Sequence, residues 1–218
     1  MAKPYFRDWS NMSLHKGKSF LAPPRPFKAD VSLYFPNLYG RTLLKEDKKP
    51  RDTTPTLQGK VSVVAVYGNL WAENQAKTFV DAKSNPQLHR LLAENEGTAQ
   101  LVRVNLEDNW LRAAIITFFM GNLRKTYGKE NWDKYFLVRT AVSDEIREHI
   151  GLLNSKVGYV YLVDQECRIR WAGSGNAEGD ENEGLIKAVQ RVLAEMGKKS
   201  TPRLSEKPAP KPVEEARQ

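Results

Sequence analysis

The sequence contains a single cysteine, Cys167, among 218 residues. One thiol excludes an internal disulfide and any zinc site built from several cysteines. Long apolar segments are also missing, because the longest apolar-rich run without charge is AAIITFFMGNL (113–123). This run is well short of the roughly 18 residues that a membrane-spanning helix requires. We therefore expect a soluble or peripheral protein.

Catalytic motifs are absent as well. The three histidines, His15, His89 and His149, share no metal-ligand spacing with one another or with Cys167. The sequence has neither a phosphate-binding Gly-x-x-x-x-Gly-Lys-Ser/Thr loop nor a Gly-x-Ser-x-Gly nucleophile elbow. Its glycine-rich segment GSGNAEGDENEG (173–184) is acidic and would repel phosphate. The sequence therefore predicts a protein that is not an enzyme, with no catalytic, cofactor-binding or metal-binding residues.

What the sequence has in excess is positive charge at its two ends. Residues 1–60 carry 12 basic and 5 acidic residues, and residues 198–218 carry 6 and 3. The middle of the chain, 61–197, carries 16 basic and 18 acidic residues, so it is close to neutral. Basic ends of this kind either bind the phosphates of RNA or of lipid headgroups through electrostatics alone, or stay solvated.

The ends also differ from the middle in their prolines. Residues 1–28 hold six basic residues, one acid and four prolines. Few acids and many bases are typical of an organelle-targeting or matrix-exposed segment, but the prolines argue against the amphipathic helix of an ordinary presequence. Residues 198–218 combine four prolines with charges, which predicts disorder. We therefore divide the chain into a basic N-terminal extension (1–30), a folded domain (31–197) and a disordered tail (198–218).

The first half of the folded domain alternates strands and helices. VSLYFPNLYGRTLL (31–44) indicates an N-terminal hairpin of two short strands around residues 37–40. The run VSVVAV (61–66) shows no alternation, which favours a central strand covered on both faces. The apolar spacing that follows predicts helices at 71–83 and 87–94 and then a strand at 99–106, parallel to the first.

The second half begins with a strongly apolar helix. In order, the pattern predicts a helix at 108–127, a short strand at 135–139, a helix from the N-cap Ser143 to Leu153, a hairpin at 158–164 and 167–173, and a helix over 185–196 that Gly197 ends. This order of elements predicts an α/β fold. We expect a thioredoxin-like three-layer sandwich, with a central mixed sheet and helices on both faces.

A thioredoxin-like redox protein presents two thiols where a buried strand meets its helix. In VSVVAVYGNLWAENQ (61–75), Gly68 and Trp71 hold two positions at Cys-x-x-Cys spacing, and neither is a cysteine. Cys167 lies at the predicted hairpin turn, far from that junction. The segment 154–159 also lacks the proline that the fold usually places there. The sequence therefore predicts the fold without its redox chemistry.

Binding through aromatic side chains is the function that remains, because aromatic residues are enriched in protein interfaces. Our partner-binding candidates lie at the strand–helix junction and on the apolar helix: Tyr67, Trp71, Phe79, Phe118 and Phe119. Each of these positions also fits packing inside the core, so the sequence leaves both interpretations open.

Several segments, taken in order, resemble one known family. They are FPNLYGRTL (35–43), DTT (52–54), LQGKVSVV (57–64), WAENQ (71–75) with Phe79, and VGYVYLVD with RIRWAGSG (157–175). Together they are similar to the mitochondrial ATP synthase assembly factors called the ATP ten family, over residues 28–197. The family often has a serine near the position of Gly68, so this chain differs from the pattern in that loop.

The resemblance implies a thioredoxin-like protein that lacks redox cysteines and lies on the matrix side of the mitochondrial inner membrane. It implies a non-enzymatic chaperone that binds newly made membrane subunit a of the F-type ATP synthase and promotes its assembly with the subunit c ring. Basic ends suit anionic inner-membrane lipid, at about 1 kcal/mol per Lys or Arg near the surface, and no nucleic-acid partner is expected. Two alternatives stay open: a degenerate redox protein that uses Cys167, and a mitochondrial RNA-associated protein that uses its basic ends.

Overall fold

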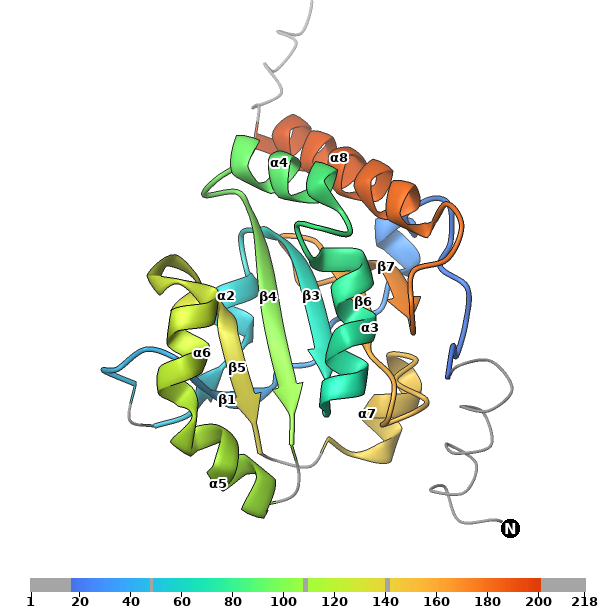
Figure 1. Cartoon of the computed structure of the whole chain (residues 1–218). Coiled ribbons are helices and arrows are strands. Elements are labelled where there is room, and N and C mark those ends of the chain that lie inside the picture. Colours follow the sequence, from blue (N-terminus) through green and yellow to red (C-terminus); the bar gives the residue numbers. More distant parts are fainter. Residues whose placement is uncertain (1–16, 48, 108–109, 140–141, 201–218) are drawn as a thin grey trace, which may run out of the picture.

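The computed structural model describes residues 17–200 apart from 48, 108–109 and 140–141 (Figure 1). Residues 1–16 of the predicted N-terminal extension lie outside the described residues. The same holds for 201–218, which make up nearly all of the predicted disordered tail.

The strands in the described part of the chain form one seven-stranded sheet in the order β2-β1-β5-β4-β3-β6-β7. They are β1 (Tyr39–Thr42), β2 (Arg51–Asp52), β3 (Val61–Tyr67), β4 (Ala99–Leu106), β5 (Tyr135–Val138), β6 (Tyr159–Val163) and β7 (Ile169–Ser174). β3 and β4 pair in parallel, as do β4 and β5, whereas β6 pairs antiparallel with both β3 and β7. This mixed sheet, with helices between β3 and β4 and after β7, confirms the predicted thioredoxin-like fold.

Helices cover both faces of the sheet, which gives three layers (Figure 1). They are η1 (Ala29–Val31), α2 (Thr54–Leu57), α3 (Leu70–Val80), α4 (Pro86–Glu94), α5 (Trp110–Phe118), α6 (Met120–Tyr127), η2 (Lys129–Lys134), α7 (Asp144–His149) and α8 (Glu181–Ser200). α3, α4 and α8 share one apolar cluster with the sheet, and α6 packs beside β5 through Met120. Leu57 of α2 and Ile150 next to α7 belong to the cluster on the opposite face. Within the described residues, none of these helices has both the length and the apolar character of a membrane span.

β3 shows why the sequence folds in this way. All seven of its residues are buried. Val64 and Val66 join the cluster on one face, and Val63 and Ala65 join the cluster on the other. An unbroken apolar run is what a central strand needs when helices cover both of its faces.

Four predicted helix boundaries are wrong. The helix expected at 71–83 ends at Val80, and the helix expected from Ser143 to Leu153 ends at His149. The single helix expected at 108–127 is divided into α5 and α6 at Phe119, whose backbone angles (φ −86°, ψ 8°) leave the helical region. The closing helix does not end at Gly197 but continues to Ser200. A Cβ added to Gly197 would meet no atom within 4 Å, and a helix at the surface tolerates one glycine for about 1 kcal/mol.

One prediction for the N-terminal part also needs correction. The hairpin expected within 31–44 does not form, because β1 pairs with β2 across a longer loop and with the edge of β5. The described part of the predicted N-terminal extension, residues 17–30, contacts the domain. It runs beside β7 and α8 (Figure 1), and the backbone N–H of Phe27 donates to the carbonyl of Arg170 (2.6 Å).

Candidate functional site

The parallel strands β3, β4 and β5 bring three polar side chains together near one end of the sheet. Tyr67, the last residue of β3, pairs in register with Asn105 of β4, and Tyr135 of β5 pairs with Arg103. Residues paired in register, and those two positions apart along a strand, share a face of the sheet. Tyr67, Asn105 and Tyr135 therefore all lie on the face that α3 and α6 cover.

The loop between β3 and α3 offers no nucleophile. A Cβ built on Gly68 would lie 2.6 Å from the carbonyl oxygen of Leu106, so a larger residue would force this loop away from β4. Asn69 caps α3, because its Oδ1 accepts a hydrogen bond from the Ala72 N–H (2.9 Å). A reactive thiol would need this helix N-terminus to lower its pKa. A neutral amide occupies the position instead.

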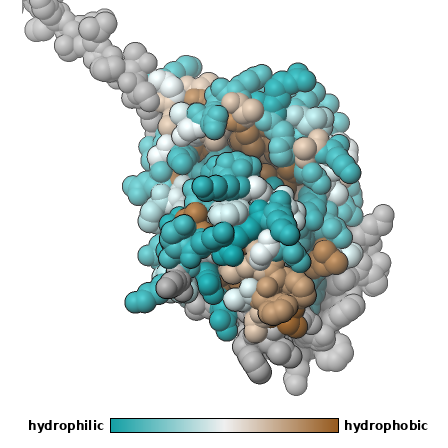
Figure 2. All heavy atoms as spheres, turned by 60° about the vertical axis from the view of Figure 1, so that its left-hand side comes forward, coloured by the Kyte–Doolittle hydropathy of each residue, from teal (hydrophilic) through white to brown (hydrophobic). Residues whose placement is uncertain are grey.

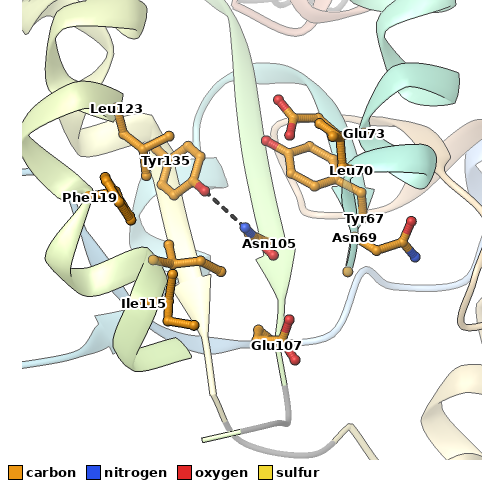
Figure 3. A pocket seen from close by; sticks show the side chains of 12 residues that line it. Tyr67, Asn69, Leu70, Glu73, Asn105, Glu107, Ile115, Phe119, Leu123 and Tyr135 are labelled. Carbon is orange, nitrogen blue, oxygen red and sulfur yellow. Dashed lines mark hydrogen bonds between the residues drawn. The ribbon is translucent and has the colours of Figure 1, made fainter. Parts of the chain in front are cut away.

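A cavity of about 490 Å³ lies between α3 and the α5–α6 pair (Figure 3). Tyr67, Asn105 and Tyr135 line its inner end, where the Asn105 side-chain amide donates to the Tyr135 hydroxyl (3.0 Å). Glu73 and Leu70 line it from α3. The facing wall is apolar and consists of Ile115, Ile116, Phe119 and Leu123. The cavity thus combines a polar end with an apolar side.

Polar contacts tie α3 to α6 beside this cavity. The Tyr127 hydroxyl donates to Oε1 of Glu73 (3.1 Å), and Lys77 Nζ forms an ion pair with the same oxygen (2.8 Å). The Arg103 guanidinium lies 4.6 Å from the centre of the Tyr127 ring. These contacts hold Glu73 at the cavity wall.

Tyr67 is the buried polar group of the cavity. Its side chain is 4% exposed, and its hydroxyl points into the cavity next to Glu73 (Figure 3). Tyr127 is a near neighbour but donates to Glu73, and within the described residues the Tyr67 hydroxyl has no hydrogen-bond partner. Burial, followed by the nearby hydroxyls of Tyr135 and Tyr127, raises the pKa of Tyr67 well above its ordinary value. An interaction of the Tyr67 O–H with the Tyr127 hydroxyl adds to this rise, so the Tyr67 hydroxyl stays neutral and its oxygen remains able to accept a hydrogen bond.

Exposed apolar side chains surround the mouth of the cavity. Leu70 is 70% exposed, Phe118 is 84% exposed, and Ile115 and Phe119 are about half exposed. The rings of Phe118 and Phe119 stand perpendicular with their centres 5.3 Å apart. We call Leu70, Ile115, Phe118 and Phe119 the apolar rim. Figure 2 shows apolar surface gathered toward the end of the molecule where α5 lies.

The structure brings three of the five predicted candidates together. Tyr67 and Phe119 line the same cavity, and Phe118 contacts Phe119 outside it. Trp71 is partly exposed, and its ring lies against Gly17 rather than in the cavity. Phe79 is fully buried and packs edge-on against Trp171 (5.9 Å between ring centres). Phe79 is therefore a core residue with no surface to offer a partner.

Comparison with known proteins assigns the family. The model of the family described as "ATP10 protein" matches residues 1–192. The chain belongs to this family. It is 32% identical over 180 residues to the "Mitochondrial ATPase complex subunit ATP10" of Eremothecium gossypii and, equally, to that of Candida glabrata. Both alignments cover 82% of this chain and 64% of the relative, so the chain spans less than two thirds of the length of these relatives.

The chain also aligns with solved structures at low sequence identity. A secreted thiol-disulfide isomerase from Corynebacterium glutamicum aligns with a TM-score of 0.48 and 9% identity, over 80% of this chain and 93% of that chain. A thiol:disulfide interchange protein of the thioredoxin family from Chlorobium tepidum aligns with a TM-score of 0.39 and 15% identity, over 74% and 97%.

The one cysteine of this ATP10 family member is remote from the cavity. Cys167 is buried in the turn between β6 and β7, where its backbone is left-handed (φ 62°) and its N–H donates to the Asp164 carbonyl (2.9 Å). Burial, and then the Asp164 carboxylate, raise the pKa of the Cys167 thiol. A raised pKa reduces the thiolate fraction, which opposes nucleophilic chemistry. In the described part of the chain, no three His, Cys, Asp or Glu side chains are placed to hold a metal ion.

Sequence reasoning missed four cavity residues of the ATP10 chain: Asn69, Glu73, Asn105 and Tyr135. Asn69 carried a signal, because asparagine just before a helical pattern is a common N-cap. Asn105 carried a weaker one, as a polar residue near the end of an otherwise apolar strand. Glu73 and Tyr135 had none, since their meeting depends on strand register and on the position of α6.

Proposed function

We propose that this chain is a non-enzymatic assembly factor of the mitochondrial F-type ATP synthase. It binds newly made membrane subunit a and promotes the joining of that subunit to the subunit c ring. The names of the ATP10 relatives support the complex, and the family resemblance supports the client. The chain spans 64% of the length of the Eremothecium gossypii and Candida glabrata relatives, so their role in the complex is proposed for it rather than established.

The observation that carries the proposal is the apolar rim beside the cavity. Four apolar side chains face solvent together, and one of them, Leu70, lies at the β3–α3 junction, which carries no thiol. An apolar patch of this kind marks an interaction site in a soluble domain. A membrane subunit before insertion exposes apolar segments, which such a patch is able to cover.

The place of action is the matrix face of the inner membrane, where the protein is peripherally bound. The basic residues of the two ends supply attraction to anionic lipid, at about 1 kcal/mol for each Lys or Arg near the surface. This arrangement keeps the near-neutral domain next to the site of subunit insertion while leaving the apolar rim for the client.

Capture of freshly labelled, organelle-made proteins from mitochondria tests the client. We expect wild type to capture subunit a and Phe118→Asp to capture at least tenfold less, because a carboxylate in the centre of an apolar contact must be desolvated. Val31→Asp is the matched control, since Val31 is 73% exposed and apolar but belongs to η1. Val31→Asp and Cys167→Ser are expected to capture as wild type does.

Loss of capture is informative only if the variant is folded, so the melting temperature of each variant is measured as well. A folded Phe118→Asp protein that captures subunit a as well as wild type contradicts binding at the apolar rim. Loss of capture in Cys167→Ser alone would favour the thiol-based alternative.

A further inference from the structure

We propose that the cavity receives one basic side chain, Lys or Arg, carried by the apolar segment that covers the apolar rim. This inference rests on the proposed function, because the segment belongs to the client, and it specifies what the client must present. Of the described residues that line the cavity, Glu73 and Glu107 are acidic and none is basic. A cationic group is therefore the charge complement of this lining.

The polar end of the cavity is rich in hydrogen-bond acceptors. Figure 3 shows the Glu73 carboxylate and the Tyr67 hydroxyl pointing into the same space. Asn105 donates through its amide nitrogen to Tyr135, which leaves its carbonyl oxygen to accept. The Tyr67 hydroxyl oxygen, buried and without a partner among the described residues, is a third acceptor. Ammonium and guanidinium groups donate three and five hydrogen bonds and accept none, so they match such an end.

The apolar side of the cavity fits the rest of such a side chain. Lys and Arg carry three or four methylenes that pack along apolar surface while the charged head reaches a polar environment. The wall of Ile115, Ile116 and Leu123 offers that surface, and the Phe119 ring lies near the mouth. The charged head then lies at the inner end beside Glu73, with the client backbone outside on the apolar rim.

Two cations in the described part of the chain lie near Glu73, and neither fills the cavity. Lys77 pairs with Oε1 of Glu73 from the next turn of α3 and is partly exposed. Arg103 stacks on the Tyr127 ring. Neither Lys77 nor Arg103 lines the cavity. A basic side chain that enters the cavity therefore competes with Lys77 for the Glu73 carboxylate. Substitution of Lys77 is for this reason a useful test.

The test measures binding of synthetic peptides to the full chain by fluorescence anisotropy. The probes are labelled 18-residue helical peptides of leucine, alanine and serine that differ only at one central position, arginine or glutamine. We expect the arginine peptide to bind wild type about tenfold more tightly than the glutamine peptide, as one buried charge-assisted contact provides. Glu73→Gln is expected to reduce this ratio to less than twofold, and Tyr67→Phe to reduce it about threefold.

Two further variants separate direct contact from general charge effects. Glu183→Gln removes an exposed acid of α8 that also pairs with a lysine at i+4, Lys187, and is expected to leave the ratio unchanged. Lys77→Gln releases Glu73 from its ion pair and is expected to increase the ratio. An arginine-to-glutamine ratio near one in wild type overturns the inference, and so does a failure of both peptides to bind.

The inference and the proposed function fail in different ways. If capture of subunit a depends on Phe118 while the peptide ratio is near one, the client site stands and the basic side chain does not. If the peptide ratio is tenfold and lost in Glu73→Gln while capture is independent of Phe118, the cavity binds a basic side chain of a different partner. A ratio that persists in Glu73→Gln overturns the assignment of the cavity.

Discussion

Two regions of the same sheet differ in how far the chain itself covers them. On the β7 flank the chain covers its own edge, because residues 17–35 run beside β7 and α8 (Figure 1). There Lys18 Nζ donates to the carbonyls of Ser174 (3.0 Å) and Asn176 (2.8 Å) and pairs with Oε2 of Glu181 (2.8 Å). Over the central strands β3, β4 and β5, between α3 and the α5–α6 pair, the described chain leaves the apolar rim in solvent, and no described residue meets the geometric criterion for a hydrogen bond to the Tyr67 hydroxyl.

The contrast separates structural aromatic residues from those available to a partner. On the covered flank the Trp171 indole N–H donates to the Pro23 carbonyl (2.8 Å), and Phe79 packs against the Trp171 ring. Folding alone therefore gains the energy of these contacts. The apolar rim gains nothing comparable from folding, so its burial energy is released only when a second molecule covers it.

The largest expected difference between the two regions concerns two phenylalanines. Phe79→Ala should lower the free energy of unfolding by about 4 kcal/mol, because it leaves a cavity in a fully packed core. Phe118→Ala should change it by less than about 0.5 kcal/mol, because that ring is 84% exposed. Urea unfolding of both variants measures the two values.

The effects of these two variants on client capture should be ranked in the opposite order to their effects on stability. Phe118→Ala is expected to weaken capture of subunit a while Phe79→Ala, below its melting temperature, retains it. If Phe118→Ala lowered the free energy of unfolding by 2 kcal/mol or more, Phe118 would belong to the core and the two regions would not differ in this way.

These two residues also show what the sequence could and could not predict. Phe79 lies three and seven positions after Ala76 and Ala72, which is the spacing of one helix face, and all three are buried. Helical periodicity could therefore have assigned Phe79 to the core. Phe118 could not be assigned in this way, because the single helix expected over 108–127 breaks one residue later, at Phe119.

Local sequence patterns were sufficient to predict the fold. The buried run of β3 and the Ser143 cap of α7, whose Oγ accepts from the Ile146 N–H (3.3 Å), both appear where the sequence places them. Local patterns could not predict the cavity, since Tyr67, Asn105 and Tyr135 meet only through the register of three strands far apart in sequence. Local chemistry thus predicts elements, whereas the site depends on long-range pairing.

A second prediction compares two lysines that both pair with α8. Lys18→Ala should lower the free energy of unfolding by about 3 kcal/mol, because both partners of its ion pair with Glu181 are more than nine-tenths buried. Lys187→Ala removes a largely exposed pair with Glu183 and should cost less than about 0.5 kcal/mol. Chemical denaturation of the full chain gives both values. Equal small losses would mean that the N-terminal segment contributes little to the β7 flank.

A third prediction compares two buried tyrosines after removal of the hydroxyl. The Tyr159 hydroxyl accepts from the Asn154 N–H (2.9 Å) and bonds the Ser19 hydroxyl (2.8 Å). Tyr159→Phe should therefore cost about 2 kcal/mol, because it leaves a buried N–H unsatisfied. Tyr67→Phe should instead stabilise the free protein by about 1 kcal/mol, since its hydroxyl is buried without a partner in the described residues. Destabilisation by both substitutions would show that the Tyr67 hydroxyl is already bonded in the free protein.

The smallest expected effect concerns Tyr67 at high pH. Burial, and then the neighbouring Tyr135 and Tyr127 hydroxyls, raise the pKa of Tyr67 in the folded protein above the value near 10 of an unfolded chain. Stability from this group is thus fully present below pH 10 and is lost as the pH rises further, because only the unfolded state then releases the proton. The loss is about 0.4 kcal/mol at pH 10 and grows by about 1.4 kcal/mol per pH unit beyond it.

Tyr67→Phe removes this loss, so the stability difference between the variant and wild type should widen from pH 9 to pH 11. Urea unfolding across that range measures the difference, and repeating it in a Tyr127→Phe background removes the contribution of Tyr127, whose pKa the Tyr67 hydroxyl lowers. A difference independent of pH would mean that the hydroxyl ionises as easily in the folded protein as in the unfolded chain. Water would then reach the inner end of the cavity freely, and a basic side chain would gain little there from Tyr67.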